Sequence, residues 1–255
     1  MEFGILGQVR ASADGSSVDV GVRKQRFVLA VLLLEVNKLV PADRLITLMW
    51  PSGGPSSARA VLHNQVSGVR SMLASARADR HDVSLVSDGP GYVLRCDAQR
   101  IDVHRFRALC GQARRHVDDE CRVELFTQAL DLWRGPALAG VADDDVRVRL
   151  SRHLDEARLV ALEDRFDAEL RLGRHRVVVD ELEEVAAEYP HRQHLIGLLM
   201  RALDRCGRTG EALRAYHDLY RRLDDELGIL PSPELQLLQL DLLRQPVLGE
   251  PVAVP

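Results

Sequence analysis

The chain of 255 residues has few cysteines and lacks long apolar segments. Its cysteines fit no zinc-ligand spacing and are too widely spaced for a dense disulfide framework. The N-terminus lacks a basic stretch followed by an apolar run, and no run reaches the roughly 18 apolar residues of a membrane span. We therefore expect a reduced, cytoplasmic protein that is neither secreted nor inserted in a membrane. The four cysteines are Cys96, Cys110, Cys121 and Cys206.

The sequence also lacks the common catalytic and nucleotide-binding motifs. It has no G-x-x-x-x-G-K-[ST] phosphate loop, no H-E-x-x-H zinc motif and no G-x-S-x-G nucleophile motif. His191 and His194 have a spacing that can hold a metal, but no carboxylate or cysteine follows in register, which favours a surface pair at a helix start. We therefore expect no enzymatic activity and no cofactor or metal.

Lysine is nearly absent, since Lys24 and Lys38 are the only two among 34 basic residues. This bias favours a GC-rich genome over a functional use of the phosphate chemistry of arginine. The net charge of -4 is unevenly placed, because residues 1–100 hold 12 basic and 9 acidic side chains, whereas residues 101–255 hold 22 and 29. The first hundred residues are therefore the better candidate for binding a polyanion.

Short runs at the N-terminus have the pattern of a small mixed domain. Residues 2–10 and 17–21 predict two strands of a hairpin, because residues 13–16 have a turn composition. Residues 24–36 are apolar on nearly every side and predict a core helix. Residues 41–50 predict a second helix, with Pro41 in its first turn, where its missing N–H would lack a partner in any case.

Residues 56–73, SSARAVLHNQVSGVRSML, predict a third helix that Ser56 or Ser57 caps. Residues 83–86 and 92–95 flank the turn SDGPG and predict a second hairpin, with Tyr92 bracing its base. This order of elements describes a winged helix-turn-helix, whose third helix enters the DNA major groove while the last hairpin lies along the backbone or minor groove. The apolar positions of the third helix are Leu62, Val66, Val69 and Leu73.

The outward face of the third helix supplies the DNA-contact candidates, although a plain amphipathic helix fits the pattern alone equally well. We expect Arg70 to contact guanine, Asn64 to contact adenine and Arg59 to hold a phosphate. Lys24 and Arg26 are further phosphate candidates, for which a solvated helix end is nearly as good an interpretation. The full predicted DNA-binding set is Arg59, His63, Asn64, Ser67, Gly68, Arg70, Lys24, Arg26 and Gly91.

The remaining residues are mostly helical in pattern and contain an internal repeat. The dipeptides Gly173-Arg174 and Gly207-Arg208 are 34 residues apart, and Leu182 and Tyr216 keep the same offset. This period is typical of tetratricopeptide-like helix pairs, although an accidental coincidence is the alternative. We expect a turn relieved by Gly207 or Gly210, and the repeat stacked between a long helix at 144–172 and a last helix at 233–244.

Several stretches resemble a known family. Residues 24–50, the segment VSGVRSML and the segment PGYVL resemble the OmpR-type winged helix of the Streptomyces antibiotic regulatory proteins, or SARPs. The segments ALDLWRGPAL, GRTGEALRAY and DELGILPSPELQLL resemble the bacterial transcriptional activator domain that follows it. The resemblance implies a mainly α protein with a winged helix over residues 1–97, an all-α tetratricopeptide-like domain over residues 101–245 and a flexible tail over residues 246–255.

The resemblance also implies a function. SARPs are sequence-specific transcriptional activators of secondary-metabolite genes, which bind direct repeats in double-stranded promoter DNA as a homodimer or tandem pair. They recruit RNA polymerase holoenzyme with its sigma factor. Gly68 stands where relatives carry arginine, and Asp88 stands where wings often carry a basic residue, so we expect weak binding by one copy. The alternative is a helical-repeat adaptor whose winged helix binds protein rather than DNA.

Overall fold

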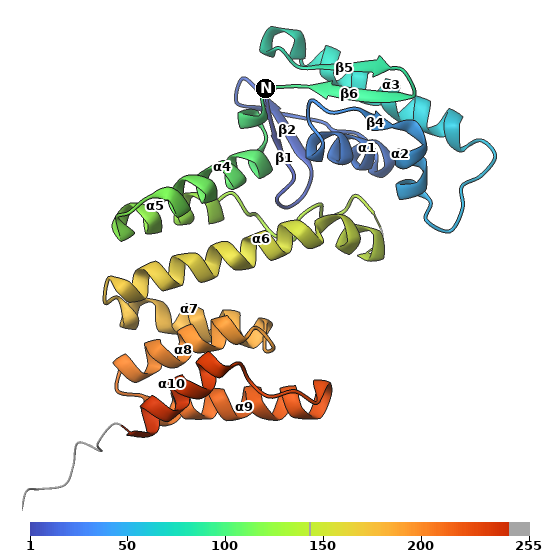
Figure 1. Ribbon diagram of the computed structural model, residues 1–255. Coiled ribbons are helices and arrows are strands. Elements are labelled where there is room, and N and C mark those ends of the chain that lie inside the picture. The colour runs from blue at the N-terminus through green and yellow to red at the C-terminus, as the bar shows by residue number, and fades with distance from the viewer. Residues whose placement is uncertain (143, 245–255) are drawn as a thin grey trace, which may run out of the picture. The chain divides into compact units, whose positions relative to one another are not determined.

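The computed structural model describes residues 1–142 and 144–244 of a mainly helical chain with two small sheets (Figure 1). The chain divides into two compact units. The first contains residues 1–116 and 124–161, and the second contains residues 117–123 and those from 162 onward. The predicted tail at 246–255 lies outside the described residues. The mainly α fold with an N-terminal winged helix is confirmed.

The first sheet is a meander of β1 (Glu2–Gly4), β2 (Arg10–Ala13) and β3 (Ser16–Val18), each antiparallel to its neighbour. The prediction of one unbroken strand over residues 2–10 is wrong, because the backbone turns between β1 and β2. The reason is a distant partner. The carbonyls of Ile5 and Leu6 accept hydrogen bonds from the backbone N–H groups of Leu138 and Arg134, more than a hundred residues along the chain.

The three predicted helices and the second hairpin of the winged helix are confirmed, with small changes at their ends. The elements are α1 (Arg23–Leu34), α2 (Ala42–Met49), α3 (Ala58–Ser75), a short 3-10 helix η1 (Ala78–His81), and the wing strands β5 (Ser84–Asp88) and β6 (Gly91–Arg95). Residues 27–33 of α1 are all buried, as the apolar pattern predicts. The four apolar side chains of α3 are buried too, so its polar residues face outward.

Of two predictions about helix starts, the one for Pro41 is wrong and the one for Ser57 is confirmed in position only. Pro41 does not lie in the first turn of α2, because its ψ of 140° is extended and it belongs to the two-residue strand β4 (Val40–Pro41). That strand pairs with β6, which gives a second sheet of order β4-β6-β5. Proline suits this edge strand, where a missing N–H leaves no ladder bond unmade. Ser57 is the N-cap residue of α3, but its side chain makes no capping hydrogen bond.

A buried carboxylate joins three distant segments of the first unit. Asp102, the first residue of α4 (Asp102–Arg115), is 3% exposed. Its oxygens accept hydrogen bonds from the backbone N–H groups of Ile5 at 2.9 Å and Leu6 at 3.1 Å, and from Nη2 of Arg134 at 3.0 Å. This carboxylate therefore bonds residues on both sides of the predicted boundary at 97–101, a boundary that stays a prediction.

The segment after α5 (Asp119–Leu130) completes this packing. Trp133 lies edge-on to Phe106 of α4, with ring centroids 5.5 Å apart, and the guanidinium of Arg158 lies 5.2 Å from the centre of the Trp133 ring. Residue 158 lies on the long helix α6 (Asp144–Arg171), the predicted helix at 144–172. The aromatic ring therefore links α4 to the part of α6 that belongs to the first unit.

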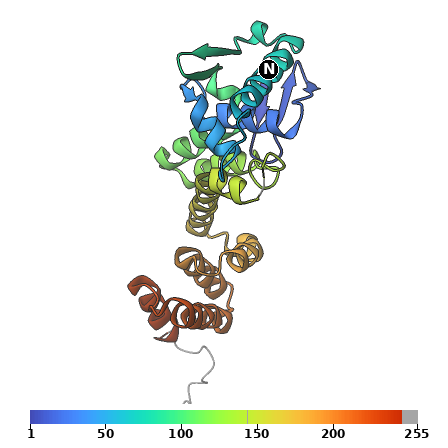
Figure 2. The same cartoon turned by 90° about the vertical axis from the view of Figure 1, so that its right-hand side faces the viewer.

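The second unit contains the predicted helical repeat. Its helices α7 (His175–Glu188), α8 (Gln193–Arg205), α9 (Thr209–Leu227) and α10 (Pro233–Arg244) are seen nearly end-on in Figure 2. Gly173 and Gly207 both follow a helix end, with φ values of 77° and 78° that glycine adopts without strain. Leu182 and Tyr216 are both buried. The 34-residue offset is thus structural, and Gly207 rather than Gly210 forms the turn.

The structure also bears on disulfide bonds and on membrane-spanning helices. None of the four cysteines, which all lie in the described part of the chain, forms a disulfide. Within residues 1–142 and 144–244, no helix combines the length and the apolar character that crossing a bilayer requires.

His104 on α4 gives the first unit a pH dependence. It is half-buried, and its Nε2 donates a hydrogen bond to the carbonyl of Leu33 at 3.1 Å. Burial lowers the pKa of His104 below its ordinary value of 6.5, against the opposing effect of that hydrogen bond. The unfolded chain therefore binds this proton more tightly, so the contribution to stability is complete above about pH 6.5 and declines as the pH falls towards the folded pKa.

We expect His104→Gln to flatten part of the decline in the free energy of unfolding between about pH 7.5 and pH 5. Urea titrations of both proteins across this range measure the two slopes. Equal slopes would mean that His104 has the same pKa in the folded and unfolded chain.

Candidate nucleic-acid interface

Helix α3 lies beside the wing formed by β5 and β6, as Figure 1 shows. On the outward face of α3 the predicted residues Arg59, His63, Asn64, Ser67 and Arg70 are exposed. The wing turns at Gly89 and Pro90, with Asp88 exposed at the end of β5. The amide and hydroxyl of Asn64 and Ser67 can donate to and accept from base edges. We call the surface made of these exposed α3 residues and of the wing, β5 and β6 with their turn, the reading face.

A shallow hollow of about 230 Å³ lies between α3 and the wing, and the start of α2 closes one side. His63 contributes to this hollow, and its ring stands edge-on to Tyr92 with centroids 6.2 Å apart. Tyr92 is 4% exposed, which confirms that it braces the base of the wing. The hollow also contains Arg59 and Ser87. Ser87 was not in the predicted set.

Arg59 is paired within the chain rather than free for a phosphate. Its Nη2 lies 2.5 Å from Oδ1 of Asp43 on α2, and both side chains are more than half exposed. An exposed pair of this kind contributes little and is screened by salt, so a phosphate can replace Asp43. The sequence carried no signal for this pair, because the two residues are 16 positions apart on different helices.

Arg70 is also engaged, and its partners lie in the wing. Its Nε donates to the carbonyl of Leu85 at 3.0 Å, and its Nη2 donates to Oγ of Ser87 at 2.9 Å. The outward direction predicted from the helical wheel is right. The base contact predicted for its guanidinium remains a prediction, since these two bonds hold the group against β5.

Gly68 and Gly91 have structural roles that the sequence did not reveal. A Cβ on Gly68 would stand 2.5 Å from Oε1 of Gln25, so the Gln25 side chain from α1 lies over Gly68, which is half-buried. Gly91 is buried, and a Cβ there would stand 2.2 Å from the carbonyl oxygen of Val40. Glycine is therefore required where β4 packs against β6, and the DNA contact predicted for Gly91 remains a prediction.

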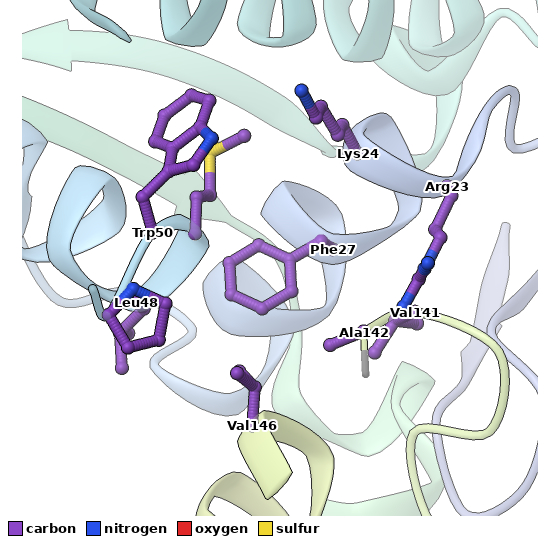
Figure 3. Close-up of a pocket in the computed structure, with 10 residues that line it drawn as sticks. Arg23, Lys24, Phe27, Leu48, Trp50, Val141, Ala142 and Val146 are labelled. Carbon is purple, nitrogen blue, oxygen red and sulfur yellow. The ribbon is translucent and has the colours of Figure 1, made fainter. Parts of the chain in front are cut away.

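Lys24 and Arg26 lie apart from the hollow that holds His63. The ammonium of Lys24 is 5.1 Å from the centre of the Trp50 ring, a cation–π contact, at a separate cavity of about 250 Å³ (Figure 3). Phe27 lies at the centre of that view, with Trp50 to one side of it. Arg26 is half-buried, with its Nε inaccessible to solvent. Lys24 is the more exposed of the two, and a phosphate contact by either residue remains a prediction.

Comparisons of the sequence and of the structure with known proteins both find bacterial regulatory proteins. A family described as the bacterial transcriptional activator domain matches residues 101–243. The regulatory protein AfsR of Streptomyces coelicolor is 40% identical over 98% of this chain, and DnrI of Streptomyces peucetius is 37% identical over 96%. This chain spans 25% of AfsR and 92% of DnrI.

A solved structure extends the likeness to three dimensions. Mycobacterium tuberculosis EmbR, in complex with a low affinity phosphopeptide, superposes with a TM-score of 0.89 at 35% identity. The match covers 96% of this chain and 65% of that one. Both the winged helix and the helices that follow it therefore have counterparts in a single relative.

Proposed function

This chain belongs to the bacterial transcriptional activator domain family, in the arrangement of the SARP regulators, and we propose that it activates transcription by binding promoter DNA through its winged helix. The observation that carries the proposal is the reading face, where the polar side of α3 lies exposed next to an exposed wing. Relatives named as regulatory and transcriptional regulatory proteins support it.

We assign DNA reading to residues 1–97 and contact with RNA polymerase holoenzyme, including its sigma factor, to residues 101–245. The reading face has few unpaired charges, since Asp43 accompanies Arg59 and the wing ends in Asp88. Each phosphate contact contributes about 0.9 to the salt slope of log affinity, so one copy has a weak electrostatic hold. Two copies on a direct repeat, as a homodimer or tandem pair, compensate by raising the effective concentration of the second contact.

Titration of the full chain onto fluorescent duplexes tests this proposal. At low salt we expect tighter binding to duplexes from its own promoter regions than to random duplexes of the same length. Asn64→Ala should reduce this preference by about 1 to 3 kcal/mol if its amide pairs with adenine. Arg214→Ala on α9, at a side chain that is 74% exposed, is the matched control and should bind as the unaltered chain does.

The low charge of the reading face also favours a second candidate, a helical-repeat adaptor whose winged helix binds another protein. The same titration separates the two functions. Equal binding to promoter and random duplexes at low salt would reject sequence-specific DNA binding and leave the adaptor.

A further inference from the structure

We propose that Arg70 is a positioning residue, which fixes the wing to the recognition helix α3 instead of reading a base. The inference rests on the proposed DNA-binding function. It assigns to Arg70 the task of holding the two halves of the reading face in one arrangement. Asn64 and Ser67 lie on the helical half, and Ser87 and Asp88 lie on the wing half.

The geometry of the two hydrogen bonds supports this role. Arg70 reaches the Leu85 carbonyl through Nε and the Ser87 hydroxyl through Nη2. These donors are fixed in one plane by the guanidinium group, so they hold two points of β5 at once. Fixing two points on a strand restricts its rotation as well as its distance from α3. A single bond would restrict only the distance.

The position of β5 in its sheet explains why it needs such a partner. The strand order is β4-β6-β5, so β5 has a paired neighbour on one side only. The outer edge of such a strand presents backbone groups that lack ladder partners. Arg70 donates to one of them, the carbonyl of Leu85, and thereby ties the open edge of the wing to α3.

A bidentate base contact by Arg70, which needs the guanidinium turned towards the DNA, would compete with these bonds. Moving the guanidinium to DNA leaves the Leu85 carbonyl and the Ser87 hydroxyl without their donor, which offsets the new hydrogen bonds. Holding the wing in place before DNA arrives instead reduces the entropy lost when the wing and α3 bind together. The observed contacts therefore favour positioning over reading.

A double-mutant cycle that combines Arg70→Ala with Asp88→Arg in the full chain tests the inference. The measured quantity is the affinity for the promoter duplex that the protein protects in a footprint. Asp88→Arg should tighten binding and raise the salt slope by about 1 or more, because it replaces a repelling charge with a phosphate contact. Arg70→Ala should weaken binding by about tenfold. In the Arg70→Ala background most of the gain from Asp88→Arg should be lost, because the wing tip is no longer held at the DNA.

Two further variants separate positioning from charge. Arg70→Lys keeps the positive charge but replaces the rigid planar fork with a flexible ammonium group, so it should no longer fix both points of β5 and should behave as Arg70→Ala does. Ser87→Ala should weaken binding by about threefold, and adding it to Arg70→Ala should change little further, because both remove one shared bond. Urea titration of each variant verifies that it is folded at the assay temperature.

A panel of duplexes with single base-pair substitutions distinguishes positioning of the wing from reading of a base by Arg70. If Arg70 positions the wing, Arg70→Ala weakens binding to every duplex by the same factor. Loss of discrimination at one base pair, or a full Asp88→Arg gain without Arg70, would overturn the inference. Hydrogen exchange of β5 amides in the protein without DNA adds an independent readout. It should accelerate in Arg70→Lys even if promoter preference is absent, whereas unchanged exchange would also overturn the inference.

Discussion

Asp102→Asn is expected to lower the free energy of unfolding of the first unit by about 3 kcal/mol, because it disrupts a buried ion pair while leaving its partners in place. The carboxylate accepts from two backbone N–H groups and from Arg134. Asparagine has the same shape but replaces one acceptor oxygen with an NH₂ donor. At least one of the three donors then faces another donor in a buried site.

Urea unfolding followed by tryptophan fluorescence measures this loss, since Trp50 and Trp133 both lie in the first unit. The matched control is Asp88→Asn, the same chemical change at an exposed carboxyl, which should alter stability by less than about 0.5 kcal/mol. A loss at Asp102 no greater than that of the control would mean that the hydrogen bonds to Ile5 and Leu6 contribute nothing net.

Gly91→Ala is expected to cost about 2 to 3 kcal/mol, in the range found when a packed site receives an extra methyl group. The added Cβ would overlap the carbonyl oxygen of Val40 at 2.2 Å and approach Cα of Pro41 at 2.9 Å. Both atoms belong to the backbone of β4, so no side-chain rotation relieves the overlap. The pairing of β4 with β6 should open, and the wing should lose its support.

The control for Gly91 is Gly89→Ala, two residues away in the same hairpin. Gly89 has a φ of 47° and no atom within 4 Å of the added Cβ, so its substitution costs only the left-handed backbone strain of about 1 to 2 kcal/mol. Hydrogen exchange of the β6 amides distinguishes the two variants, because only Gly91→Ala should release β4. If both variants lose equal stability and β6 exchange is unchanged in each, the overlap at Gly91 is absorbed elsewhere.

Elements with a strong local pattern were predictable from the sequence. The apolar spacing of α3 predicted its buried side, and the 34-residue offset predicted the turns at Gly173 and Gly207. These features depend on helical periodicity and on the conformational freedom of glycine. Both are local properties, which a short stretch of sequence is enough to reveal. The outward direction of Arg59 and Arg70 follows from the same periodicity, and the structure agrees.

What the outward side chains touch was not predictable, because their partners are distant in the sequence. Arg59 meets Asp43, Arg70 meets Leu85 and Ser87, and Gln25 covers Gly68. A helical wheel gives a direction for each side chain but cannot include an element packed alongside. The sequence therefore could not show that Arg59, Gly68 and Arg70 each have a neighbour within the chain, whereas their DNA contacts remain predictions.

The sequence by itself determined the helices, the wing hairpin, the repeat and the family, since these are properties of local pattern and of quoted motifs. Tertiary structure decided where the first unit ends and how the reading face is held together. Asp102 joins Ile5, which follows β1, to Arg134 far along the chain, and Arg70 joins α3 to an open strand edge. Buried polar groups and strand edges need partners, and only the folded chain brings those partners within hydrogen-bond distance.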